Sequence, residues 1–355
     1  MILWLAPMDG ITDLPYRIIT KRIFDKYNTN PENQLRLWTE FMTSDGYVAN
    51  PHKVIKHLIH TEFEKPLILQ IFGWKKEKLL ATAIDLEKKF WIWKNWEIKI
   101  AWIELNTGCP SNTVMKNWWW SALLKDKIET LNIIKTLSEK LTVPFSIKTR
   151  TWLNEDDKKA QLDFLVKASK YCHMISVHAR TLKELYTGDW DRDFIYKLKE
   201  EIAKTWNNCK VIWNWAIKYH EEINNKLNNL DWVMIWQAAI WNPRIFTSHK
   251  PSIQEKYKTI IEHFELMAKW EIFIKDIQLE ELDWPRIYPK LKDIESINLK
   301  ENYDKIYYTP LLFRKYLHQY LKWIVWSKDL KEQCNKTTNF KENIDYIKWF
   351  FKKRA

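Results

Sequence analysis

Eight short apolar segments, rich in β-branched residues, recur along the first part of the chain, and lysine-rich amphipathic stretches separate them. The segments read ILWLAPM, LRLWTEF, PLILQIFG, AWIELNTGCP, PFSIKTR, MISVHAR, KVIWNW and DWVMIWQAAI. Strands that alternate with helices of roughly 10 to 25 residues form parallel βαβ units. Eight such units in about 240 residues predict a closed (β/α)8 barrel, the TIM barrel, and an open doubly wound sheet is the alternative.

The pattern changes near residue 252, where strand signals end and long helical periodicity begins. The chain of 355 residues also exceeds the roughly 250 to 300 residues at which a single core stops growing. We therefore expect a barrel domain over residues 1–251 and a smaller helical domain over residues 252–355. Basic and aromatic residues cluster in the second domain, in the segments FRKYLHQYLKW and IKWFFKKRA.

Composition narrows the class of protein. A hydrophobic share of 46% with 29% charged residues is typical of a globular protein, and apolar runs of membrane-spanning length are missing from the sequence. The N-terminus lacks the sections of a signal peptide, so we expect a cytoplasmic protein without a membrane partner. Its cysteines, Cys109, Cys172, Cys209 and Cys334, lie far apart, which favours neither a metal site nor a disulfide framework.

The net charge of +12 favours a polyanionic partner such as nucleic acid, because lysines and arginines that neutralise phosphates release counterions. A lysine-rich surface without a binding role is the alternative. In a barrel of this class the chemistry lies at the carboxyl ends of the strands. Those ends carry Pro7 with Met8, Glu40, Gln70, Asn106 with Cys109, Lys148 with Arg150, His178 with Arg180, Asn214, and Trp236 with Gln237.

A series of motifs in a fixed order resembles a known family, the bacterial tRNA-dihydrouridine synthases. The motifs are LAPMDGITD, TEF, QIFG, IELNTGCPS, LLKD, SIKTR, VHART, VIWNW and VMIWQAAIWNPRIF, with a weaker echo in FRKYLHQYLKWIVW. The resemblance implies an FMN-dependent TIM barrel that reduces the C5–C6 bond of uridines in tRNA, with NADPH or NADH as reductant. It also implies a helical domain that helps to hold tRNA. Two alternatives stay open: an FMN barrel that reduces a free pyrimidine, and an inactive RNA-binding relative.

The resemblance also implies roles for individual residues. Cys109 would be the general acid that protonates C5 of uracil, because a flavin supplies only the hydride. A fixed ammonium at Lys148 would stabilise the negative charge of reduced flavin. The residues expected to hold the flavin are Pro7, Met8, Gln70, Lys148, His178, Asn214, Trp215, Ala216, Trp236 and Gln237, and those expected to face the substrate are Asn106 and Arg150. Many relatives carry arginine where Gln237 stands, so we expect only its backbone to contribute. We expect a monomer without a metal.

Tryptophan is unusually frequent and glycine unusually rare, with 23 Trp against 5 Gly. Average usage of about 7% would give roughly 25 glycines. The family has three glycines where this chain reads WWW, and Gly-Asn-Gly where it reads WNW. Our hypothesis is that the source reads the codon UGA as glycine, whereas the printed sequence was translated with a table that reads it as tryptophan. The positions concerned are Trp118, Trp119, Trp120, Trp213, Trp215, Trp236 and Trp241, and also Trp74, Trp102, Trp152 and Trp232.

The tryptophans have two alternative interpretations. Three adjacent indoles could form a platform for stacking bases, but consecutive side chains point to different sides in a strand or a helix. All 23 could instead be genuine core residues, which would require glycine-poor loops throughout an eight-turn barrel. A few, such as Trp38, Trp190 or Trp284, could be genuine under either reading.

Overall fold

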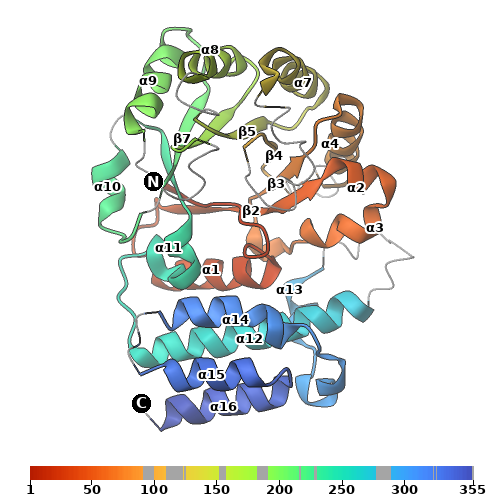
Figure 1. Ribbon diagram of the computed structural model, residues 1–355, viewed down its shortest axis with the longest axis vertical. Coiled ribbons are helices and arrows are strands. Elements are labelled where there is room, and N and C mark those ends of the chain that lie inside the picture. The colour runs from red at the N-terminus through yellow and green to blue at the C-terminus, as the bar shows by residue number, and fades with distance from the viewer. Residues whose placement is uncertain are drawn as a thin grey trace.

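The computed structural model describes residues 1–90, 100–108, 123, 125–151, 157–181, 191–215, 217–227, 230–276, 289–322, 324 and 326–353 (Figure 1). The strands are β1 (Ile2–Leu5), β2 (Gln34–Thr43), β3 (Leu67–Phe72), β4 (Trp102–Asn106), β5 (Phe145–Arg150), β6 (Met174–His178), β7 (Lys210–Trp215) and β8 (Trp232–Ile235). The helices are α1 (Leu14–Tyr27), α2 (Ser44–Ala49), α3 (Pro51–Val54), α4 (Lys76–Phe90), α7 (Lys127–Lys140), α8 (Lys158–Ala168), α9 (Arg192–Ala203), α10 (Glu222–Leu227), α11 (Gln237–Trp241), α12 (Ile253–Asp276), α13 (Leu291–Glu295), α14 (Thr309–Tyr320), α15 (Lys328–Lys336) and α16 (Phe340–Lys352).

The strands form a closed barrel. They pair in parallel and in sequence order from β1 to β8, and β8 pairs back with β1. Seven strands fall within their apolar segments and β2 extends beyond its segment at both ends, so the TIM-barrel prediction is confirmed and the open sheet is wrong. These strands read as nearly continuous apolar runs because a parallel sheet is covered on both faces, here by the outer helices and by the barrel interior (Figure 1).

Strand β2 carries one irregularity. Its register against β3 shifts between Trp38, which pairs with Ile68, and Phe41, which pairs with Gln70. Two residues of β2 therefore stand opposite a single residue of β3, which is the arrangement of a β-bulge. The Thr39 hydroxyl accepts a hydrogen bond from the backbone N–H of Gln70 at 3.1 Å, so the ladder bond disturbed by the bulge is replaced by a side chain.

Tryptophans fill the barrel interior toward the amino ends of the strands. The ring of Trp4 lies 4.9 Å from that of Trp38, 5.5 Å from that of Trp102 and 5.0 Å from that of Trp232. Because β1 and β4 are not neighbours in the sheet, the contact between Trp4 and Trp102 crosses the interior. The indole N–H groups of these two residues are buried and have no hydrogen-bond partner within the described ranges; a buried donor left unpaired costs about 1 to 3 kcal/mol.

The C-terminal helices stack against one side of the barrel (Figure 1). Helix α12 packs on α1, and α14 packs on α11 and α12. The junction is aromatic: the ring of Tyr16 in α1 stacks on Tyr316 of α14 at 5.6 Å, and the His263 ring of α12 lies 4.5 Å from that of Tyr316. Within the parts of the chain that the structure describes, no helix is both long enough and apolar enough to span a bilayer.

Candidate active site at the carboxyl ends of the strands

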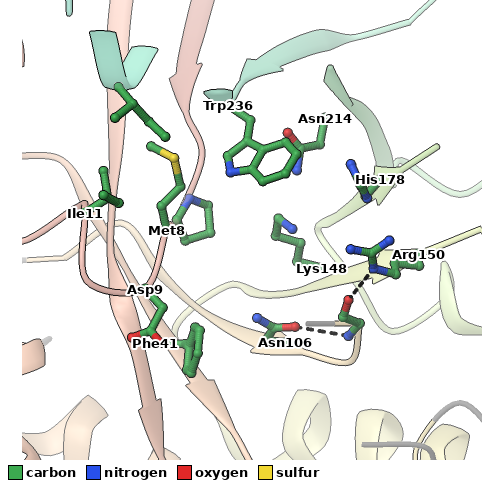
Figure 2. A pocket seen from close by; sticks show the side chains of 13 residues that line it. Met8, Asp9, Ile11, Phe41, Asn106, Lys148, Arg150, His178, Asn214 and Trp236 are labelled. Carbon is green, nitrogen blue, oxygen red and sulfur yellow. Dashed lines mark hydrogen bonds between the residues drawn. The ribbon is translucent and has the colours of Figure 1, made fainter. Parts of the chain in front are cut away.

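A cavity of about 330 Å³ opens at the carboxyl ends of the strands. Ligand pockets in proteins usually measure about 300 to 1,000 Å³. The lining residues come from strand ends and from the loops that follow them: Pro7, Met8, Asp9, Ile11, Phe41, Asn106, Gly108, Lys148, Arg150, His178, Asn214, Trp236 and Ile240 (Figure 2).

A chain of hydrogen bonds runs from the barrel interior to Asn106 at the cavity. The Nδ2 of Asn106 donates to Oε1 of Gln70 at 3.0 Å, and the Nε2 of Gln70 donates to Oε1 of Glu104 at 2.6 Å. The Oδ1 of Asn106 accepts from the backbone N–H of Gly108 at 3.0 Å. These bonds fix the orientation of both amides, and Gln70 itself is buried beneath the cavity instead of lining it.

Glu104 is the charged end of this chain. Burial raises the pKa of its carboxyl to about 7, and the opposing effects of the hydrogen bond from Gln70 and of the nearby Lys148 ammonium are smaller. The Ser146 hydroxyl also donates to Oε2 of Glu104, at 3.4 Å. The carboxyl therefore changes its charge near neutral pH, directly beneath the cavity floor.

Arg150 donates hydrogen bonds to two loops, the one after β4 and the one after β6. Its side chain is buried, and its Nε donates to the carbonyl of Gly108 at 2.9 Å while its Nη1 donates to the carbonyl of Thr181 at 3.0 Å. The loop after β4 lies so close to β5 that a Cβ on Gly108 would stand 2.7 Å from the backbone nitrogen of Arg150 and 2.9 Å from the carbonyl carbon of Thr149. Only glycine fits this position without moving backbone.

The side of the cavity formed by β6, β7 and β8 carries His178, Asn214 and Trp236. Burial lowers the pKa of His178 well below its usual value, and the charges of Arg150 and Lys148 lower it further, so the imidazole is neutral at pH 7. Among the residues that the structure describes, none provides a hydrogen-bond partner for the buried Oδ1 of Asn214. The indole of Trp236 stands in the cavity, perpendicular to the His178 ring at 5.4 Å (Figure 2).

The loop between β1 and α1 supplies the opposite side. Within this loop the N–H of Met8 donates to Oγ1 of Thr12 at 2.9 Å. Gly10 adopts a φ of +66°, in the left-handed region. The N–H of Gly10 donates to Oε1 of Glu40 at 2.6 Å. Burial, with a further contribution from Glu40, raises the pKa of the Asp9 carboxyl.

The structure gathers most of the residues that the sequence nominated. Those that line the cavity are Pro7, Met8, Asn106, Lys148, Arg150, His178, Asn214 and Trp236. Gln237 is exposed at the start of α11. Trp215 is the last residue of β7, and the structure describes only its backbone. Cys109 and Ala216 lie outside the described residues.

Sequence reasoning missed five lining residues: Asp9, Ile11, Phe41, Gly108 and Ile240. All five lie in the quoted segments and motifs, and attention to polar and glycine residues just after a strand could have found Asp9 and Gly108. Apolar Ile11 and Ile240 carry no such signal. Among the residues that the structure describes, no cluster of three histidine, cysteine or acidic side chains could hold a metal ion.

Comparison with known proteins identifies the family. The family model described as "Dihydrouridine synthase (Dus)" matches residues 4–279. The chain is 28% identical over 244 residues to tRNA-dihydrouridine synthase B of Pseudomonas aeruginosa, covering 68% of this chain and 67% of that protein. It is 26% identical over 286 residues to tRNA-dihydrouridine synthase B of Pseudomonas syringae pv. tomato, covering 77% of each. The protein of the same name from Pasteurella multocida is 26% identical over 279 residues, covering 74% of this chain and 76% of the relative. With a family match over most of its length and a cavity at the catalytic end of a closed barrel, this chain belongs to the dihydrouridine synthase family.

Proposed function

We propose that this protein reduces uridines in tRNA to dihydrouridine, with FMN as its cofactor and NADPH or NADH as the reductant. The observation that carries the proposal is the cavity, where the ends of β4, β5, β6 and β7 bring Asn106, Lys148, Arg150, His178 and Asn214 together. The family is flavin-dependent. Polar side chains held at the carboxyl ends of the barrel strands suit this cofactor, because the protein must orient the flavin relative to the substrate.

The donor set in the cavity fits a flavin nucleotide. The ammonium of Lys148 can balance negative charge on the pyrimidine edge of the ring system or on the phosphate. The buried Oδ1 of Asn214 is an acceptor without a donor among the described residues, which a ring N–H could satisfy. Neutral His178 can donate a hydrogen bond without adding charge. Pro7 and Met8 supply apolar contact from the loop after β1.

The predicted proton donor follows directly after Gly108 in sequence. The chemistry that FMN would supply here is a hydride for C6 of the uracil. The thiol of Cys109 then delivers the proton that C5 requires. Nε of Arg150 donates to the carbonyl of Gly108 at 2.9 Å. We therefore propose that Arg150 fixes the position of Gly108, the residue before the acid, in addition to facing the substrate. Asn106 lines the same cavity, and its proposed role is to face the substrate.

The test replaces Cys109 with alanine in protein that carries glycine at the recoded positions. FMN content and flavin reduction by NADPH should persist, while dihydrouridine formation in unmodified tRNA should fall by about 10² to 10⁴. Cys172 is buried and away from the cavity lining, so Cys172→Ala is the matched control, with turnover nearly intact. Full synthase activity in Cys109→Ala would refute the acid. Equal turnover of free uridine and tRNA by the unaltered protein would favour the free-pyrimidine enzyme.

We also propose that the natural protein has glycine at many of the printed tryptophans. The indole of Trp236 stands in the cavity that the flavin would need (Figure 2). Trp206 supports the same conclusion independently. It has a φ of +57° just after α9 and is 95% exposed; glycine is the usual residue at left-handed positions after helices, and a bulky side chain there is rare.

The gene tests this proposal. The codons expected to be UGA are those of Trp118, Trp119, Trp120, Trp213, Trp215, Trp236 and Trp241, together with Trp206. Peptide masses from protein of the native source should show glycine at the same positions. UGG codons there would end the hypothesis. Tight FMN binding by the chain with all its tryptophans would show instead that the indoles do not block the flavin site.

For the remaining organisation we propose a catalytic domain over residues 1–251 and a tRNA-binding helical domain over residues 252–355, in a monomeric cytoplasmic enzyme. The support is the change from strands and helices to helices alone at α12, together with the net charge of +12. Sedimentation of the purified protein and a tRNA-binding measurement at two salt concentrations test the monomer and the electrostatic contact.

A further inference from the structure

The loop between β1 and α1, residues 6–13, is held from the C-terminal helices as well as from the barrel. Two neighbouring residues of α14 reach it. The ammonium of Lys315 donates to the carbonyl of Gly10, and the hydroxyl of Tyr316 donates to the carbonyl of Ile11 at 2.6 Å. Both carbonyls belong to the loop that forms one side of the cavity.

The Tyr316 hydroxyl is held in place by its surroundings. The side chain is fully buried, its ring stacks on Tyr16 with an interplanar angle of 14°, and His263 packs against it edge-on at 4.5 Å. Oδ2 of Asp13 lies 3.1 Å from the same hydroxyl. Burial also raises the pKa of Tyr316 well above its usual value, so the phenol keeps its proton and stays a donor.

The barrel holds the same loop from the other side. The N–H of Gly10 donates to Glu40 at 2.6 Å, and Nδ1 of His57 lies 3.3 Å from the second oxygen of that carboxylate. Gly10 is thus held through its N–H by β2 and through its carbonyl by α14. Its neighbours Asp9 and Ile11 both line the cavity, so the position of this part of the lining depends on both halves of the chain.

We infer that Lys315 and Tyr316 are positioning residues of the active site: they set the loop that lines the flavin cavity, although they belong to the helical region. This inference rests on the proposed function, because it takes the cavity as the flavin site. The competing explanation is that the two residues only fasten α14 to the barrel, in which case any lost hydrogen bond at this junction would have the same effect.

Tyr316→Phe tests the inference, with Tyr320→Phe as its matched control. Each removes one buried hydroxyl from the same helix and keeps the ring. The Tyr316 hydroxyl holds the loop, whereas that of Tyr320 pairs with Nδ1 of His263 at 2.9 Å. In flavin-free protein, hydrogen exchange of the amides of residues 10–13 should be roughly two- to tenfold faster in Tyr316→Phe, the range expected for one neutral hydrogen bond. Tyr320→Phe should leave it unchanged.

In protein that carries glycine at the positions proposed to be recoded, FMN affinity, measured by the quenching of flavin fluorescence, should fall by a similar factor in Tyr316→Phe. Lys315→Met should weaken it as well, and Lys315→Arg should restore it, because a guanidinium can also donate to the Gly10 carbonyl. Urea titrations of Tyr316→Phe and Tyr320→Phe show whether both lose comparable stability. Equal effects of these two variants on loop exchange, or no effect of either, would overturn the inference. The proposed function fails separately, if the glycine-bearing protein without further substitutions makes no dihydrouridine. That result would not affect the comparison of hydrogen exchange between Tyr316→Phe and Tyr320→Phe.

Discussion

Gly108→Ala should damage catalysis more than it damages the fold. A Cβ at this position would lie 2.7 Å from the backbone nitrogen of Arg150, whereas ordinary contacts begin near 3.4 Å. The loop after β4 must therefore retreat by about 0.7 Å, because its neighbour is backbone in a barrel strand. Overpacking of this kind costs about 1 to 3 kcal/mol of unfolding free energy, and a misplacement near 1 Å at a reacting group can cost about 10² in rate.

The assay compares the free energy of unfolding in urea, the FMN content and the rate of dihydrouridine formation in the glycine-bearing protein. Gly46→Ala is the control. Its added Cβ would meet methyl groups of Thr43 and Val54 at 2.6 and 3.1 Å, so it introduces comparable overpacking against side chains instead of against the backbone of a cavity strand. We expect Gly46→Ala to keep its activity. If Gly108→Ala turns over tRNA at the parental rate, the loop after β4 is not held as closely as the structure indicates, and the reasoning fails.

Three further predictions concern stability. Arg17→Met should cost about 3 to 5 kcal/mol, because Nε of Arg17 lies 2.5 Å from Oε1 of Glu64 with both side chains buried, and the change leaves the buried carboxylate without its counter-charge. Adding Glu64→Gln should recover part of that loss, and a urea titration showing less than about 1 kcal/mol for the single variant would contradict this. The Glu104 carboxyl has a pKa of about 7 when folded against an ordinary 4.5, so it should remove up to about 3 kcal/mol of stability as pH rises between these values. Glu104→Gln should flatten the stability profile between pH 5 and 8, and an identical decline in both proteins would exclude Glu104 as the cause. Trp206→Gly should raise the urea midpoint by relieving a left-handed backbone that costs about 1 to 2 kcal/mol, and a lower midpoint would show that the indole contributes packing.

The barrel was predictable because its signals are local. Each of the eight strands is a short apolar run, and closure follows from their number and from the helices between them. The bulge in β2 was not predictable from the same pattern. A strand buried on both faces loses the alternation of polar and apolar residues that would reveal a change of register.

The site was predictable where the barrel rule applies, and less so elsewhere. Lys148, His178 and Asn214 were nominated as strand-end residues, and all three line the cavity. Gln70 was nominated by the same rule but lies one layer deeper, because its amide is engaged by Glu104 and Asn106. No local pattern marks contacts such as that of Lys315 with Gly10, 305 residues apart in sequence.

The additional residue in β2 bears on how the lengths of relatives can vary. Trp38 packs on Trp4 inside the barrel and Phe41 lines the cavity, although residues three apart in a regular strand face opposite sides. The bulge at Thr39 and Glu40 lets both face inward. A one-residue deletion between them would leave Trp38 and Phe41 two residues apart, and residues two apart in a regular strand face the same side. A relative that is one residue shorter at this point can therefore keep both side chains directed inward without a bulge, and what it loses is the hydrogen bond from the backbone N–H of Gln70 to the side chain of Thr39.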